Sequence, residues 1–362
     1  MHSLVVLADQ PRWNGYYALI FPLYKWRSLL KRHGIKLSIT TDKNDSHLKS
    51  ADTVVIISRV FKEWQSIKSR TPQSEAALIA YLTDLKKTVK KIVWYDRTDS
   101  TGSTDFPIIQ YVDVFLKNQV LKDVNYYTQN NGAKSVRAWI ADSNKLEDHF
   151  KIYFPCPADQ LYKIKVGWNL GHVNYKLFSS SKVHRLTGNY LFAAPKVYEP
   201  STDRKLDFSL RGNLDYGSIN ASISAQRNAV ISVLKELTNY HGIISGQRVD
   251  KPTFMKELAE SKICVSPFGW GEICYRDFEI FIAGSLMIKP SVSYMNTYPD
   301  IFVENETYIP VLNEMDDLKQ KLEEVLSNYS KYTPIAKNGQ QAFLNAIADG
   351  EAFVQHIKNI IS

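Results

Sequence analysis

The stretch that decides the fold runs from Lys262 to Ile301 and reads KICVSPFGWGEICYRDFEIFIAGSLMIKPSVSYMNTYPDI. It begins with a short apolar strand, passes through a turn interrupted by glycines, and enters a helix that ends at Gly284. A second apolar strand follows and ends at Pro290. A strand, a loop, a helix and a strand in this order predict one unit of a parallel α/β sheet.

The loop of this unit has features of a nucleotide site. Gly269 and Gly271 lack a Cβ, so a ligand can approach their backbone, and N–H groups at the start of a helix can bind phosphate. Glu272, Arg276 and Glu279 are expected on one face of the helix, at positions i, i+4 and i+7. Either these three form a solvated ion-pair ladder, or Glu279 binds ribose hydroxyls while Arg276 faces phosphate.

The composition is that of a soluble protein large enough for two domains. The chain has 362 residues, of which 44% are hydrophobic and 23% charged, and no run approaches the roughly 20 apolar residues that span a bilayer. The N-terminus lacks the basic region of a signal peptide, so we expect a cytoplasmic protein. The formal net charge of +8 favours anionic partners, including peripheral contact with an anionic membrane surface. No nucleic-acid motif accompanies that charge, so no nucleic-acid partner is predicted.

Strands and helices alternate in two separate parts of the chain, which predicts two Rossmann-like domains. In the first part, strands are expected at 4–8, 36–40, 53–57, 91–95 and 112–116, with helices at 16–33 and from Ser74 to about 90. In the second part, strands are expected at 206–210, 243–245, 263–266, 286–289 and 308–311, with helices at 224–240 and from Pro252, Glu272, Met315 and Pro334. We therefore expect an N-terminal domain over 1–200, with an irregular linker, and a second domain over 201–333. C-terminal helices over 334–362 are expected to cross back to the first domain.

The segments SPFGWGE, CYRDFE and AGSLMIKP, within 266–290, resemble the donor-binding half of GT-B glycosyltransferases, most closely the exostosin-like and group 1 type domains. The resemblance implies two Rossmann-like domains that face each other across a cleft. It also implies transfer of a sugar from a nucleotide-activated donor to a glycan or lipid-linked glycan, with Glu279 as the ribose-binding acid. Glu272 precedes Glu279 by seven residues, one short of the Glu-x7-Glu spacing of many retaining members, and an inverting reaction is expected.

Further candidates follow other strands of the two expected sheets. Arg211 comes directly after the first strand of the second domain, and it is either a solvated loop residue or a ligand of two diphosphate oxygens. Asp96 and Asp99 follow an apolar strand of the first domain, where they either form an Asx-type turn or accept the proton of an acceptor hydroxyl. We favour Asp99 as the base because it lies further from the strand end, and Asp96 and Asp9 are the alternatives. The cleft beside Asp9 is expected to include Trp13, Asn14 and Gly15.

No metal or other cofactor is predicted. The chain has no Asp-x-Asp triplet, its three cysteines have no metal-binding spacing, and His172 and His184 are isolated from other ligand types. We expect arginine and lysine side chains and a helix N-terminus to neutralise the leaving diphosphate instead. Two alternatives remain open: a GT-B-shaped epimerase or phosphorylase acting on the same ligand, and a two-lobed sugar-binding protein without catalysis.

Overall fold

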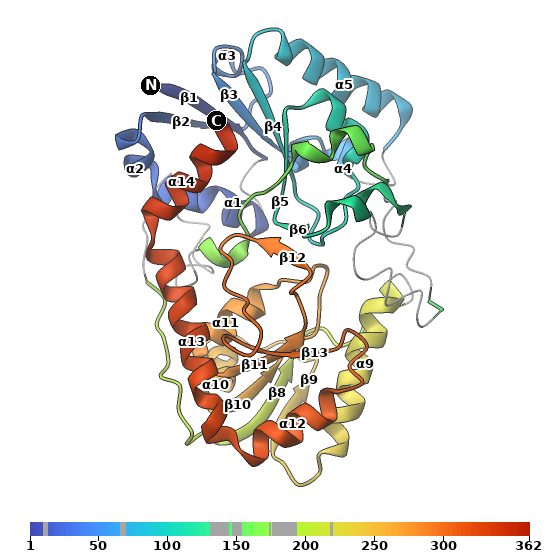
Figure 1. Cartoon of the computed structure of the whole chain (residues 1–362), viewed down its shortest axis with the longest axis vertical. Coiled ribbons are helices and arrows are strands. Elements are labelled where there is room, and N and C mark those ends of the chain that lie inside the picture. The colour runs from blue at the N-terminus through green and yellow to red at the C-terminus, as the bar shows by residue number, and fades with distance from the viewer. Residues whose placement is uncertain are drawn as a thin grey trace.

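The computed structural model describes residues 1–9, 14–65, 70–130, 145–146, 154–173, 175, 194–217 and 220–362. Within these ranges the chain forms two parallel β-sheets that lie one above the other along the long axis of the molecule (Figure 1). Helices cover the sheets, and each sheet has a buried apolar core on both of its faces. The α/β fold with two Rossmann-like domains that the alternating pattern predicts is confirmed.

In the described part of the first domain the sheet has six strands, in the order β2, β1, β3, β4, β5 and β7, and all neighbours are parallel. These strands are β1 (His2–Leu7), β2 (Ile35–Thr40), β3 (Thr53–Ile57), β4 (Lys91–Asp96), β5 (Val114–Lys117) and β7 (Ile164–Val166). All five residues of β3 are buried, as expected for a central strand covered on both faces. Sequence analysis did not predict β7, because a strand of three residues carries too little periodicity.

The helices of the first domain are α1 (Asn14–Lys25), α2 (Arg27–Arg32), α3 (Ser46–Lys49), α4 (Lys62–Gln65) and α5 (Pro72–Lys86). The prediction of one helix over 16–33 is wrong, since Trp26, with φ −102° and ψ 14°, separates α1 from α2. Trp26 packs so closely on Gly350 that a Cβ there would collide with its ring. The cap of α5 is Thr71, which forms a capping box with Ser74.

In the second domain, the described residues form five parallel strands in the order β13, β11, β10, β8 and β9. The strands are β8 (Leu206–Arg211), β9 (Gly242–Ser245), β10 (Ser261–Val265), β11 (Leu286–Pro290) and β13 (Ile309–Val311). The helices are α9 (Ala221–Glu236), α10 (Lys251–Glu260), α11 (Tyr275–Ala283) and α12 (Leu318–Ser327). Gly284 ends α11 with φ +63°, a left-handed conformation that favours glycine, as predicted.

Two C-terminal helices, α13 (Tyr329–Ala348) and α14 (Gly350–Ile361), run along the second domain and return to the first (Figure 1). The apolar face of α14, including Phe353 and Ile357, packs in the same core as β1. The start that the sequence predicts for α13, at Pro334, is five residues late. Tyr329 begins the helix because its ring is buried and its hydroxyl donates to the carbonyl of Lys262 at 3.0 Å.

A short antiparallel ladder between β6 (Gln119–Leu121) and β12 (Met295–Thr297) joins the two domains. Residues that follow β4 also contact residues that follow β10. A Cβ on Gly271, for example, would overlap the backbone carbonyl of Asp99. The carboxyl ends of the two sheets therefore meet at the domain junction, and this is the edge at which open α/β sheets bind ligands.

Candidate functional site at the domain junction

The loop between β10 and α11 is held by a capping box at the start of the helix. Cys274 is the N-cap residue, and its backbone N–H donates to Asp277 Oδ2 at 2.9 Å. The helix therefore begins at Tyr275, three residues later than the predicted start at Glu272. The prediction that Glu272 shares a helical face with Arg276 and Glu279 is wrong for this reason.

A buried ion pair between Lys289 and Asp277 also holds this loop in place. Lys289 Nζ lies 2.8 Å from Asp277 Oδ2 and donates to the carbonyl of Glu272 at 2.8 Å. The hydroxyl of Ser266 also donates to Asp277, so one carboxylate holds both ends of the loop. Sequence analysis missed Asp277 and Lys289, although the three-residue offset from Cys274 to Asp277 is the spacing of a capping box.

Two arginines from different helices meet beside this loop. Arg276 on α11 donates to Ser266 Oγ at 3.0 Å and to the carbonyl of Pro267 at 2.6 Å. Arg227 on α9 is buried and donates to the carbonyl of Phe268 from Nε at 3.3 Å and from Nη2 at 3.0 Å, and from Nη1 to the carbonyl of Asn213. Loop carbonyls thus orient both guanidinium groups while leaving their charge in place.

The two guanidinium groups converge on Gly212, at the carboxyl end of β8. A Cβ on Gly212 would lie 3.2 Å from Arg276 Nη1 and 3.7 Å from Arg227 Nη1, and the φ of this glycine is +155°. Burial, and next the charge of Arg276, lower the pKa of Arg227 to about 10. Neither arginine forms an ion pair within the described ranges. The arrangement therefore concentrates positive charge that lacks a carboxylate partner there.

The two loop glycines have different surroundings. A Cβ on Gly269 would lie 3.0 Å from Cys274 Sγ and 3.8 Å from Arg227 Nη2, so this glycine borders the arginine pair. Gly271 instead allows the backbone of Asp99 in the first domain to come close. Only Gly269 is placed where a ligand of the arginines would meet it.

Glu272 joins the two domains. Its carboxylate is buried and accepts hydrogen bonds from Thr101 N at 3.0 Å, from Thr101 Oγ1 at 2.9 Å and from Gln119 Nε2 at 2.9 Å. All three donors belong to the first domain. Glu272 was predicted to bind the donor, but its oxygens are directed to the domain contact and away from the arginine pair.

Two other predicted donor residues form ion pairs within the second domain. Arg211 makes four hydrogen bonds: two to the carboxylate of Glu257, one to Ser245 Oγ at 3.0 Å and one to the carbonyl of Gln247 at 2.7 Å. Most of its donors are therefore occupied. Glu279, which is 9% exposed, pairs with Lys251 at the start of α10. Glu279 lies one helical turn after Arg276, while Arg211 is directed away from the pair.

Asp96, at the end of β4, is fully buried and its oxygens are saturated. Lys117 Nζ lies 2.9 Å from Oδ2, and Ser103 Oγ donates to the same oxygen at 2.6 Å. Thr98 donates to Oδ1 through both its backbone N–H and its hydroxyl, at 2.7 Å each. Burial alone would raise the pKa of Asp96, but Lys117 and these hydrogen bonds hold it below its usual range. Asp96 is therefore placed as a structural ion-pair residue.

Asp99 and Asp9 are more accessible than Asp96. The side chain of Asp99 is partly exposed and makes no hydrogen bond to a described residue, while its backbone carbonyl accepts from Gln119 Nε2 at 2.6 Å. Asp9 lies 3.8 Å from Lys62 Nζ. Trp13 and the side chain of Asn14 lie outside what the structure describes, and the surroundings of Gly15 do as well. Of the three predicted bases, Asp99 is the one next to the domain contact.

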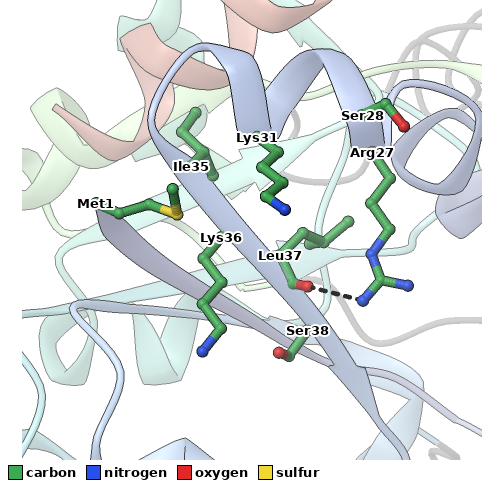
Figure 2. A pocket seen from close by; sticks show the side chains of 8 residues that line it. All are labelled: Met1, Arg27, Ser28, Lys31, Ile35, Lys36, Leu37 and Ser38. Atoms are coloured by element: carbon green, nitrogen blue, oxygen red, sulfur yellow. Dashed lines mark hydrogen bonds between the residues drawn. The ribbon is translucent and has the colours of Figure 1, made fainter.

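A surface hollow of about 520 Å³ lies elsewhere, between α2 and β2 (Figure 2). Three basic side chains border it, and Arg27 donates to the carbonyl of Leu37 at 3.4 Å. Its lining is Met1, Arg27, Ser28, Lys31, Ile35, Lys36, Leu37 and Ser38. Met1 and Ile35 stand at the amino ends of β1 and β2, whereas ligands of open α/β sheets bind at the carboxyl ends. The hollow is therefore not part of the junction site.

Of the two histidines that the sequence leaves isolated, the structure describes His172. His172 is buried between the rings of Tyr298 and Phe353, with centroids 5.5 and 5.2 Å away, and burial lowers its pKa to about 3. It is a core histidine, as expected, and His184 lies outside the described residues. No group of three or more His, Cys, Asp or Glu side chains in the described ranges is arranged to hold a metal ion. None of the helices found there is long and apolar enough to cross a bilayer.

No protein-family model matches the chain, and no curated protein matches its sequence. Among solved structures, the chain is similar to an alpha-glucosyltransferase in complex with UDP, with 10% identity, 99% of each chain covered and a TM-score of 0.43. It is also similar to T4 phage BGT in complex with UDP and Mn²⁺, with 11% identity, 100% of each chain covered and a TM-score of 0.47. A glycosyltransferase from Rickettsia africae shows 12% identity over 99% of this chain and 97% of its own, with a TM-score of 0.45. At such low identities, function has to be argued from the site itself.

Proposed function

We propose that the protein is a GT-B glycosyltransferase that moves a sugar from a nucleoside-diphosphate donor to a hydroxyl group of a glycan or lipid-linked glycan. The observation that carries the proposal is the pair of Arg227 and Arg276 beside Gly212. Two guanidinium groups that have no carboxylate partner among the described residues lie at the carboxyl edge of a parallel sheet, and their two positive charges complement the negative charge of a diphosphate.

In this proposal the donor lies along α11. Three residues of an α-helix advance by about 4.5 Å, so a ribose that follows the diphosphate comes within reach of Glu279. A carboxylate accepts hydrogen bonds from two neighbouring hydroxyl groups, and Lys251, which pairs with Glu279, is the cation beside that carboxylate. The guanidinium pair would then stabilise the negative charge that develops on the leaving diphosphate.

The acceptor is proposed to bind to the first domain. Inversion at the anomeric carbon needs a base on the side opposite the leaving group, and Asp99 is the one of the three candidate bases that lies next to the domain contact. Neither the exostosin-like relationship nor the inverting outcome has independent support, and both stay predictions.

The donor site is tested by calorimetric titration with UDP, GDP and ADP. We expect at least one of them to bind, and Arg276→Gln to weaken that binding by about 10- to 100-fold, because a hydrogen bond to a charged group contributes about 1.5 to 3 kcal/mol. Arg211→Gln should change the affinity much less, and Arg32→Gln, on the exposed end of α2, should leave it unchanged.

Three results of that titration would count against the proposal. If no nucleotide bound, the donor site would be absent. A larger loss in Arg211→Gln than in Arg276→Gln would move the diphosphate to Arg211. Nucleotide binding with epimerised or phosphorolysed products, or with no turnover on any acceptor, would favour the epimerase, phosphorylase or sugar-binding alternatives.

Turnover is expected to survive EDTA. In the proposed site Arg227 and Arg276 neutralise the diphosphate, the task that Mg²⁺ or Mn²⁺ performs in metal-dependent transferases. Initial rates with and without excess EDTA provide the measurement, followed by addition of Mn²⁺. A loss of rate that Mn²⁺ restores would show that a metal ion takes part.

A further inference from the structure

Two arginines follow neighbouring strands at the carboxyl edge of the first sheet. The parallel register of β3 and β4 pairs Ile57 with Tyr95, and Arg59 and Arg97 each come two residues further along the chain. The backbone N–H of Arg97 donates to Ser58 Oγ at 3.1 Å, which ties the two strand ends together. Local backbone structure therefore brings two cations to one place.

One nitrogen of the buried Arg97 side chain lacks a hydrogen-bond acceptor among the described residues. Arg97 is 5% exposed, and its Nε atom has no accessible surface and no hydrogen-bond acceptor among the described residues. Arg70 in the same domain shows the usual arrangement: it donates to two carbonyls, lies 3.4 Å from Asp105 and stacks on Trp64 at 3.7 Å. A buried donor without an acceptor costs free energy, which a bound ligand would offset.

The surroundings of Arg97 lie next to the proposed acceptor site. Burial, and next the charge of Arg59, lower the pKa of Arg97, whereas Asp99 and Tyr275 act in the opposite direction. Tyr275 is the first residue of α11, so these four side chains come from both domains. The two guanidinium groups outnumber the single carboxylate, and one further negative charge would balance them.

We propose that Arg59 and Arg97 bind an oxyanion of the acceptor, a phosphate ester or a carboxylate, and so hold its reactive hydroxyl beside Asp99. This inference rests on the proposed transferase function and narrows its acceptor to an anionic one. Both arginines belong to the first domain, whereas the pair assigned to the donor belongs to the second. The two oxyanion sites should therefore fill independently.

The test is a titration of the protein already saturated with its nucleotide. Glycerol 3-phosphate and glucuronate are the two anionic probes, and glucose is the neutral one. We expect at least one of the two anions to bind, with a stoichiometry of one, and glucose not to bind. The anion that binds shows whether the acceptor carries a phosphate ester or a carboxylate. Arg97→Gln should weaken this binding at least tenfold without changing nucleotide affinity, and Arg32→Gln should change neither.

Replacing the buried Arg97 could disturb folding, so Arg59→Gln, at an exposed position, is the second variant. We expect it to weaken anion binding by about threefold or more. If neither anion bound, or if nucleotide competed with the anion, the separate site would be excluded. A single-stranded oligonucleotide that bound through Arg97 when both small anions failed would also overturn the proposal, in favour of a nucleic-acid acceptor. If no nucleotide binds, the same anion titration is carried out on Arg276→Gln without nucleotide, which tests the anion site by itself. Failure of the proposed donor site can then be distinguished from failure of the anion site.

Discussion

Replacing Asp96 with Asn is expected to lower the free energy of unfolding by about 3 to 5 kcal/mol, as measured by chemical denaturation at neutral pH. The substitution leaves the ammonium group of Lys117, which is as fully buried as Asp96, without its counter-charge. It also weakens the hydrogen bonds from Thr98 and Ser103 that hold the loop after β4. The loss should be one of the largest for any single change in the first domain.

The pH dependence of this effect has a defined sign. The pKa of Asp96 is lowered in the folded protein, so its contribution is fully present above the pKa of about 3.9 that an aspartate has in an unfolded chain. The contribution disappears as the pH falls through the folded-state pKa, and the difference between wild type and Asp96→Asn should shrink in strong acid. Replacing Lys117 with Met as well should recover part of the stability. A stable Asp96→Asn protein with greatly reduced turnover would instead indicate that Asp96 is the base.

Asp99→Asn is expected to reduce the rate of the chemical step by roughly 100-fold or more, because an amide cannot accept the proton of the acceptor hydroxyl. Stability should change much less than in Asp96→Asn, because the Asp99 side chain is partly exposed and makes no hydrogen bond to a described residue, although the substitution removes a negative charge that favours the buried guanidinium of Arg97. Nucleotide affinity should not change, because Arg227 and Arg276 are untouched. Single-turnover kinetics, with calorimetry on the same preparation, measure both quantities.

Near-normal single-turnover rates in Asp99→Asn would remove this role and direct attention to Asp9, which lies at the end of β1 beside Lys62. Product NMR that showed retention of the anomeric configuration would also remove it, because a base on the acceptor side is required only for inversion. Asp9→Asn on the same protein would then separate the two aspartates.

Features that depend on a few neighbouring residues could be predicted from the sequence. The strand over 53–57, the turn of α11 into Gly284 and the start of α10 near Pro252 follow from burial patterns, left-handed glycine and proline at a helix start. The order of these elements was enough to predict two parallel sheets. Errors appeared where long-range packing decides a boundary, as at Trp26, which packs on Gly350 more than 300 residues later.

The candidate site could likewise be predicted only in part from the sequence. Sequence alone located the loop over 266–274 and the strand ends that carry Arg211, Asp96 and Asp99, because residue order determines which side chains follow a strand. It did not determine which of these side chains are free to act. Glu257 lies 46 residues from Arg211, Gln119 lies 153 residues from Glu272, and Lys117 lies 21 residues from Asp96. Only the tertiary structure brings these partners into contact, and ion pairing depends on distance in space. Among the described residues, the tertiary structure leaves Arg227 and Arg276 without an ion-pair partner, whereas Arg211, Glu272 and Asp96 have theirs or are fully hydrogen-bonded.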